Sequence, residues 1–463
     1  MGRGFLAALA GLVAAAAVLA AAPQARAQGT GLPAPGTQNA AQLDMARSLD
    51  RMCPLLPNQG TSETERLGAT CSNIVMQNMQ GNLDPELLGG VLQSLNGEEL
   101  QAAQQQVGEI SDVQIGNITA RLSAIRAGLA GPGLSVAGLN VLNGGRVLAL
   151  DDSKDLQIVP AQFAEDGFLS RLGIFATGNI TFGDKDSTGE LEGFDFDTEG
   201  LTIGADYRLT DNLVLGAAVG YSRFNAEFDE SIDSPDGQEL DSDAVQFSLF
   251  GSFYPTDQLF VDAIASVGWH FYDSERRILA PPPVLGQPGL VQSTAKGDFD
   301  AIHYGVATNV GYTIQLLGAN VTPIARLEYL RAEIDGFTED SPAAIELTFD
   351  DQDAESLPLS VGIEADYPIS TQFGIIAPNV RAEYVHDFLD NEDGVLVRYA
   401  ADNTQQSEFE VSTEDKDQDY GILGAGVATT FPAGWAAFVD YHTFVGLTNF
   451  TIHAVNVGFR KEF

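Results

Sequence analysis

The chain has 463 residues, of which 64 are Asp or Glu and 23 are Lys or Arg, and its formal net charge is −41. This excess of negative charge excludes a protein that binds the phosphate backbone of nucleic acids. After residue 27, no stretch of the sequence approaches the roughly 18 uninterrupted apolar residues that a membrane-spanning helix requires. Any membrane-spanning segments of the exported chain are therefore expected to be strands.

The first 27 residues have the organisation of a signal peptide. Arg3 precedes a long apolar run, and the small-residue site Ala25–Ala27 follows it. We therefore expect the inner-membrane secretion channel as a partner in export, and a mature chain that begins at Gln28. A retained membrane anchor is the alternative, but the Pro- and Gly-rich tract after Gln28 favours cleavage.

Residues 28–130 are predicted to form a helical N-terminal region with one disulfide. The chain has two cysteines, Cys53 and Cys71, without the C-x-x-C spacing of a redox site. The segment between them contains no His that could complete a metal site. In an oxidising compartment this pattern indicates a structural disulfide.

Two helices can be placed within this region. Asp84 and Pro85 are typical of an N-cap and a first helical position, and Asn96-Gly97 of a helix end. A longer amphipathic helix is predicted over residues 98–130, because apolar residues recur there at helical spacing. The Gly-rich and acidic stretch that follows, 131–172, is predicted to be a linker.

A period of two begins at Gly173 and continues to Phe463. Over Leu359–Tyr367, for example, every second residue is apolar or aromatic, and the residues between are Ser, Gly, Glu and Asp. We count about twelve strands of roughly ten or more residues, the length that crosses a bilayer at a tilt. A soluble β-sandwich would have shorter strands and turns of similar length.

The connections support a membrane barrel. Short turns such as 210–212 alternate with long acidic connections such as 228–242, 273–298 and 387–417, and this alternation is typical of outer-membrane barrels. The predicted fold class is all-β, a twelve-stranded antiparallel transmembrane β-barrel over residues 173–463, with a small α-helical N-terminal region. The long acidic loops are expected to be extracellular.

The polar face of these strands is predicted to line the lumen. The predicted lumen-lining residues are Arg326, Glu328, Glu364, Arg381, Glu383, Asp440 and His442. In a narrow interior such charges are expected to pair with one another or with a plug, because an unpaired buried charge is costly. The functional alternative is contact with the central helix or ion conduction.

Aromatic residues recur near the short turns. Tyr207, Tyr254, Tyr312, Tyr367 and Trp435 are expected at the membrane interface, where a ring faces lipid and its polar edge faces water.

The stretch Leu201–Arg223 and the ending "NVGFRKEF" resemble the translocator barrel of bacterial autotransporters, over about 290 residues from Gly173 to Phe463. In that family the last strand ends in an aromatic residue and is recognised by the machinery that inserts outer-membrane barrels. The resemblance implies this assembly signal at four residues of one strand face: Val455, Val457, Phe459 and Phe463. The family often has Tyr where this chain has Lys461. The resemblance also implies that the helix at 98–130 corresponds to the family's pore helix.

The resemblance implies a monomer in contact with outer-membrane lipid and the insertion machinery, without a cofactor. Its function would be to place the short N-terminal segment in the pore or at the cell surface. One alternative is a porin-like or structural barrel with a periplasmic N-terminal domain. Another is a surface hydrolase that uses His386-Asp387 or Asp440 with His442, but the chain lacks a G-x-S-x-G motif, so we expect no enzyme. The acidic loops lack EF-hand spacing, so no metal site is predicted.

Overall fold

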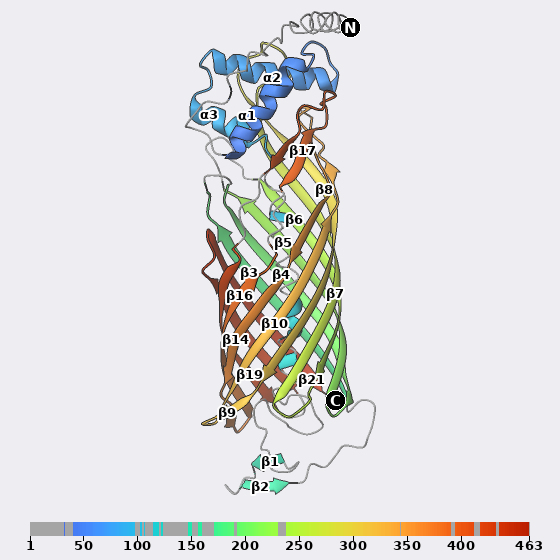
Figure 1. Ribbon diagram of the computed structural model, residues 1–463, viewed down its shortest axis with the longest axis vertical. Coiled ribbons are helices and arrows are strands. Elements are labelled where there is room, and N and C mark those ends of the chain that lie inside the picture. Colours follow the sequence, from blue (N-terminus) through green and yellow to red (C-terminus); the bar gives the residue numbers. More distant parts are fainter. Residues whose placement is uncertain are drawn as a thin grey trace, which may run out of the picture.

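The computed structural model describes residues 32, 40–97, 102–103, 106, 114–119, 122–123, 147–150, 156–159, 171–188, 192–229, 238–342, 344–389, 394–411, 417–431 and 435–462. The predicted signal peptide, Phe463 and most of the predicted linker 131–172 lie outside these residues. Figure 1 shows a long barrel with helices at one end and the chain's C-terminus at the other.

Twelve antiparallel strands close the barrel, so the predicted fold class is confirmed. The strands are β3 (Leu172–Lys185), β4 (Phe194–Thr210), β5 (Leu213–Phe228), β6 (Glu239–Phe253), β7 (Leu259–Ala280), β8 (Val291–Tyr312), β10 (Ala319–Ile334), β14 (Pro358–Asp366), β16 (Gly374–Asp387), β19 (Asp419–Phe431), β20 (Trp435–Val445) and β21 (Phe450–Glu462). Each strand pairs with its neighbour in chain order, and β21 pairs with β3 to close the ring.

The smaller strands complete the sheet content. β1 (Val147–Leu150) pairs with β2 (Leu156–Val159) inside the segment predicted to be a linker. β9 (Ile314–Leu316) and β13 (Gln352–Ser356) pair with the barrel strand β10, and β15 (Ile369–Thr371) pairs with β16. A separate four-stranded sheet, here called the loop sheet, consists of β11 (Phe337–Thr338), β12 (Leu347–Phe349), β17 (Val395–Tyr399) and β18 (Phe409–Val411).

The outer face of the barrel is apolar. On β5, the outward side chains of Leu215, Val219 and Tyr221 are about half exposed, whereas Val214 and Ala218 on the other face are buried. Because side chains alternate along a strand, one row of each strand faces outward along the whole ring. In a bilayer these outward rows contact hydrocarbon.

Four of the five predicted interface aromatics fit this outer face, and one does not. Tyr312, Tyr367 and Trp435 are exposed at strand ends, and Tyr207 is half-buried on the outward face of β4. Tyr254 was expected at the interface but packs against an apolar cluster inside the barrel, so that prediction is wrong. Among the described residues, no helix is both long and apolar enough to cross a membrane.

The predicted long connections 228–242 and 273–298 are shorter than expected, because the strands on either side of them continue further. β7 and β8 have 22 residues each and leave only the tip 281–290 between them. The alternation persists there: Ser274, Arg276 and Ile278 are buried. The connections after β10 and β16 contain the loop sheet. Extended structure persists because the inner face of these extensions is covered by other parts of the chain.

Three α-helices form a unit at this end of the barrel, here called the cap (residues 40–97). They are α1 (Ala40–Met52), α2 (Glu63–Met79) and α3 (Pro85–Gln93), with a 3-10 turn η1 (Cys53–Leu55). The predicted N-cap of α3 is confirmed, since the Asp84 side chain accepts a hydrogen bond from the Leu87 amide at 2.8 Å. α2 begins with a capping box between Ser62 and Glu65.

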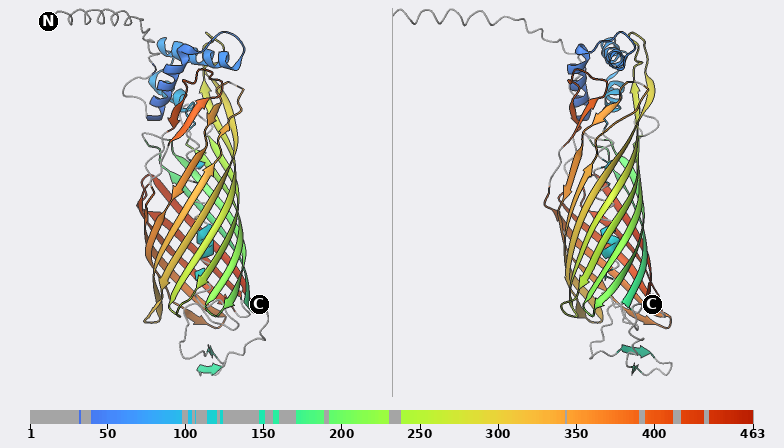
Figure 2. Two further views of the ribbon diagram at one scale, coloured as in Figure 1. Left: turned by 45° about the vertical axis from the view of Figure 1, so that its right-hand side comes forward. Right: turned by 90° about the vertical axis from the view of Figure 1, so that its right-hand side faces the viewer.

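The cap lies at the end of the barrel where the long connections gather. In Figure 2, the green and yellow strands reach the helices. The red strands, which are near the C-terminus in sequence, stop farther from the helices. A disulfide joins Cys53 to Cys71, with their Cα atoms 5.5 Å apart, and so ties η1 to α2. The short turns and the C-terminal end of β21 lie at the opposite end.

The two faces of β21 should respond differently to the same charge. Val457→Lys should lower the free energy of unfolding by about 2–4 kcal/mol, because an ammonium group on the lipid face loses its hydration. Asn456→Lys, one residue away, should cost little, because position 456 faces the lumen opposite Asp440 on β20. Urea unfolding in lipid vesicles measures both, and equal losses would contradict an outward-facing Val457.

Candidate functional site

The described helical residues between 102 and 123 lie inside the barrel. Ile115, Ile118 and Leu122 share one helix face, because they are three and four residues apart. All three are buried in an apolar cluster contributed by five strands. The strand members of this cluster are Phe175, Val214, Ala218, Phe250, Ile264 and Ala307.

Amide side chains of these helical residues donate to and accept from the hydroxyl groups of the inner wall. Gln106 Nε2 donates to Ser242 Oγ at 3.0 Å, and Asn117 Nδ2 donates to Thr202 Oγ1 at 3.1 Å. Thr202 Oγ1 in turn donates to Gln114 Oε1 at 2.5 Å. A Cβ on Gly220 would collide with Gln114, so this glycine allows the helix to approach the wall closely.

The opposite part of the inner wall carries a chain of alternating charges. Arg326 contacts Glu328 at 2.6 Å and Glu383 at 3.5 Å, and Arg381 contacts Glu383 at 3.8 Å. Asp440 then lies 3.6 Å from Arg381. Each cation thus lies beside two carboxylates, which offsets the desolvation of both signs.

The remaining predicted lumen residues continue this strip. His442 Nδ1 lies 3.5 Å from Asp440 Oδ1. Glu364 is half-buried on the inward face of β14, in register with Arg381 on β16. All seven predicted residues therefore occupy inward positions on β10, β14, β16 and β20, on the side of the lumen away from the contacts of the helix.

Three of the four residues of the predicted assembly signal lie on the outer face of β21, and the fourth, Phe463, lies outside the described residues. Val457 and Phe459 are exposed there, and Val455 is half-buried. Phe459 is in register with Ala437 on β20 and Ala176 on β3.

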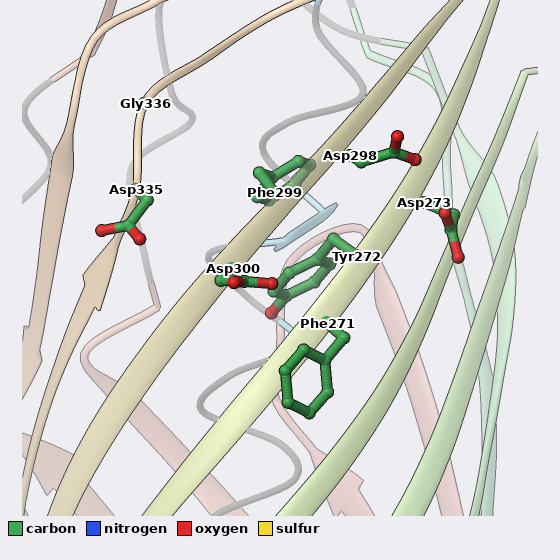
Figure 3. A pocket seen from close by; sticks show the side chains of 8 residues that line it. All are labelled: Phe271, Tyr272, Asp273, Asp298, Phe299, Asp300, Asp335 and Gly336. Carbon is green, nitrogen blue, oxygen red and sulfur yellow. The ribbon is translucent and has the colours of Figure 1, made fainter.

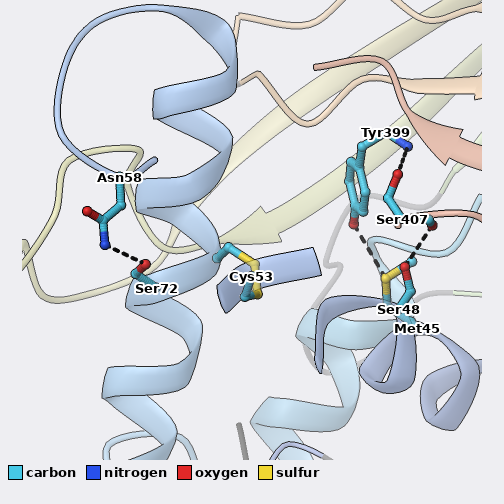
Figure 4. Close-up of a disulfide and its surroundings, with 8 residues drawn as sticks. Met45, Ser48, Cys53, Asn58, Ser72, Tyr399 and Ser407 are labelled. Carbon is cyan, nitrogen blue, oxygen red and sulfur yellow. Dashed lines mark hydrogen bonds between the residues drawn. A yellow bond between two sulfur atoms is a disulfide. The ribbon is translucent and has the colours of Figure 1, made fainter. Parts of the chain in front are cut away.

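Hydrogen bonds connect the cap to β17 and to the residues just before β18 (Figure 4). Ser48 Oγ donates to the Ser407 carbonyl at 2.7 Å, and the Tyr399 hydroxyl donates to Met45 Sδ at 3.4 Å. Arg51 donates to the Glu408 carbonyl at 2.6 Å. These contacts join α1 to residues about 350 positions later in the chain.

A buried ion pair lies where the cap meets β7. Arg276 Nη2 is 2.5 Å from Glu339 Oε2, and both side chains are almost fully buried. Arg276 Nη1 also donates to the carbonyl of Ser94 at the end of α3, at 2.8 Å. Leu347 of β12 donates its amide to the same Glu339 carboxylate at 2.8 Å. One guanidinium therefore holds together a helix, a barrel strand and the loop sheet.

The outer face of β7 and β8 carries an acidic hollow of about 430 Å³ beside Asp335. Asp273, Asp298 and Asp300 line it (Figure 3). Among the residues that the structure describes, no group of three or more His, Cys, Asp or Glu is arranged to hold a metal ion.

Of the two pairs considered for hydrolysis, His386 and Asp387 on β16 do not contact each other. His386 Nδ1 lies 2.8 Å from Asp419 Oδ1. Asp387 is buried on the opposite face, where its carboxylate accepts hydrogen bonds from Ser356 and the Leu357 amide. Adjacent residues of a strand point to opposite faces, so His386 and Asp387 cannot act together.

The connection between β3 and β4 contains a carboxyl group with a raised pKa. Burial raises the pKa of Glu192 from 4.5 to about 7; a hydrogen bond with Gln238 lowers it, and the charge of Asp229 raises it. The Asp229 amide donates to the Gly193 carbonyl at 2.9 Å, which ties this connection to the end of β5.

A closed antiparallel barrel with an apolar outer face and a polar lumen is a transmembrane β-barrel of the outer-membrane type. The family model "Autotransporter beta-domain" matches residues 174–442. The chain therefore belongs to the autotransporter β-domain family, and the resemblance noted in its sequence is confirmed. It is an outer-membrane barrel of the autotransporter type.

The curated relatives match this chain over only part of their own length. Outer membrane protein B of Rickettsia typhi is 23% identical over 269 residues, which are 54% of this chain and 16% of that protein. Esterase EstA of Pseudomonas aeruginosa is 26% identical over 214 residues, which are 45% of this chain and 29% of that protein. This chain thus spans less than a third of the length of either relative. The translocator domain of NalP from Neisseria meningitidis aligns with a TM-score of 0.49 and 15% identity, covering 65% of this chain and 90% of that domain.

Sequence reasoning missed the residues that hold the cap. Arg276 falls in the segment 273–298, which was predicted to be a long acidic connection, and Glu339 falls in the connection after β10. The one available signal was the continued alternation of Ser274, Arg276 and Ile278 with Glu275 and Arg277. That pattern indicates an extended strand with a buried arginine, but it does not identify the partner.

Arg276→Met should lower the free energy of unfolding of the cap by about 3–5 kcal/mol, because Glu339 remains buried without its partner. Arg331→Met is the matched control, since Arg331 is 42% exposed and its ion pairs lie at the surface, where such a pair contributes about 1 kcal/mol or less. Pulse proteolysis of the purified protein in a urea series gives both values. The double variant Arg276→Met/Glu339→Met should recover most of the lost stability. Equal losses in Arg276→Met and Arg331→Met would contradict a stabilising role of the buried Arg276–Glu339 pair.

The raised pKa of Glu192 predicts a pH dependence. The folded connection binds this proton more tightly than the unfolded chain, so the stabilisation is present in full below pH 4.5 and is lost as the pH rises through about 7. The lost stabilisation should appear as a change with pH in the hydrogen-exchange protection of the Asp229 amide, corrected for intrinsic exchange. Glu192→Gln should abolish this change. The exposed Asp186→Asn is the control and should leave the change intact; persistence of the change in Glu192→Gln would assign it to another group.

Proposed function

We propose that this chain carries its own N-terminal helices through the barrel to the cell surface and keeps residues between 98 and 130 in the pore. The observation that supports this proposal is the position of the cap at the end where the long connections gather. In outer-membrane barrels that end is extracellular, and the short turns face the periplasm. A helix through the lumen then connects a cap outside to a barrel whose first and last strand ends lie on the periplasmic side.

Export of the chain and insertion of its barrel require partner proteins, which the sequence indicates. We infer that the inner-membrane secretion channel exports the chain and that residues 1–27 are removed on export. The insertion machinery would then recognise the last strand through Val455, Val457, Phe459 and Phe463. The outward apolar row of β21 supports this role, because those side chains remain accessible until the strand meets lipid.

The finished barrel is proposed to act as a monomer without a cofactor and without catalysis. Ring closure pairs every barrel strand on both sides within one chain, so a second copy is not needed to cover an edge. The net charge of −41 opposes contact with nucleic acids. The paired charges of the lumen strip are proposed to have a structural role, in balancing one another beside the pore helix.

Accessibility of single cysteines in intact cells tests the proposed orientation. The two native cysteines form a disulfide, so they give no background with a maleimide. Glu86→Cys on α3 should react with a membrane-impermeant maleimide in intact cells. Asp257→Cys in the short turn after β6 should react only after the outer membrane is opened.

Both positions are exposed in the structure, so folding alone does not protect either of them. The reverse pattern, with Asp257→Cys reactive and Glu86→Cys protected in intact cells, would place the cap in the periplasm. That result would favour the porin-like alternative.

A further inference from the structure

We propose that the cap is a permanently docked lid, held on the barrel by an interface of the obligate type, so that it stays bound after the chain between the two is cut. The occupant of this interface is residues 40–97 of the same chain, and its partner surface is the loop sheet with the upper ends of β7 and β8. The proposal follows from the contacts between these parts and is independent of the side of the membrane on which they lie.

The cap and the barrel extension share one hydrophobic core. Leu49 and Leu92 of the cap are at most 2% exposed and belong to the same buried cluster as Leu347, Val397 and Tyr399 of the loop sheet. A helical unit of about 60 residues is only marginally stable by itself. The loop sheet adds apolar surface against which the cap packs, so the barrel contributes to the stability of the cap.

Asn73 of α2 holds the tip of the β7–β8 hairpin. Its Nδ2 donates to the carbonyls of Pro282 and Val284, each at 2.8 Å, and its Oδ1 accepts from the Gly286 amide at 2.8 Å. The side chain is 1% exposed. A buried amide with three backbone partners fixes both position and orientation, since removing it leaves buried polar groups without partners.

A column of stacked rings links the loop sheet to the pore. Tyr272, Phe299, Phe337 and Phe349 stack in sequence, with centroid distances of 4.6, 4.5 and 4.7 Å. At one end the Tyr272 hydroxyl donates to Gln106 of the lumen helix. At the other end Phe349 lies against Gly97, where a Cβ would be 2.9 Å from its ring. The last residue of the cap and the lumen helix therefore contact opposite ends of one rigid stack.

The buried Arg276–Glu339 pair is the fourth part of the interface between the cap and the barrel. Arg276 donates to the Ser94 carbonyl of the cap, and Glu339 accepts from the loop sheet. Separation of the cap would leave this buried network without one of its partners. Shared core, anchored hairpin tip, ring column and buried ion pair together resemble the inside of one domain more than a contact between two domains.

The test is cleavage of the full-length protein in detergent. A specific protease site replaces residues 98–101, the purified protein is cut to completion, and the products are separated by size-exclusion chromatography. The cap fragment should co-elute with the barrel. In Asn73→Ala/Arg276→Met the released fraction should rise at least about tenfold, because both anchors are lost. Asn82→Ala/Arg331→Met, with the same residue types at exposed positions, should retain the cap.

Two results would overturn the proposal. One is elution of the unsubstituted cap fragment separately from a barrel that still migrates as the folded form on unheated gels. The other is equal retention in the anchor variant and its control. If the anchor variant does not produce a folded barrel, Asn73→Ala alone provides the same comparison with Asn82→Ala. Failure of the cysteine labelling experiment would leave these outcomes unchanged.

Discussion

The structure depends on the pairing of its last strand with its first. Thirteen residue pairs connect β21 to β3, and they convert an open sheet into a ring. In hydrocarbon, an unpaired backbone group costs several kcal/mol, so an open edge would be prohibitive over a whole strand. Closure fixes which residues face lipid and which face the lumen, because each strand has two faces only.

Closure also creates a narrow interior that has to be filled. Along β3 to β8 the wall contributes hydroxyl groups, glycines and a few apolar side chains, and these contact the helix. On β10, β14, β16 and β20 the wall contributes arginines and carboxylates that contact one another. Polar groups of the lumen are therefore satisfied in two ways. Hydroxyl groups on β3 to β8 form hydrogen bonds with the helical residues in the lumen, and charged groups on β10, β16 and β20 form ion pairs with one another.

The strands that rise beyond the membrane face a different constraint. Their inner face is apolar, as at Phe196, Phe224 and Ile278, and water would make that exposure unfavourable. The cap helices and the loop sheet cover it, and the disulfide between Cys53 and Cys71 stabilises the cap from within. The same burial thus holds the cap at this end of the barrel.

The sequence by itself determined the barrel, because alternation is a local property: Val361, Ile363 and Tyr367 face outward simply because every second side chain does. It also determined the N-cap at Asp84 and the inward positions of Arg326 and Arg381. Tertiary structure alone decided that Asn73 holds a hairpin tip some 210 residues later and that Arg276 meets Glu339. Such contacts join segments that are far apart in the chain. The local sequence pattern around a residue does not determine which distant segment will pack against it.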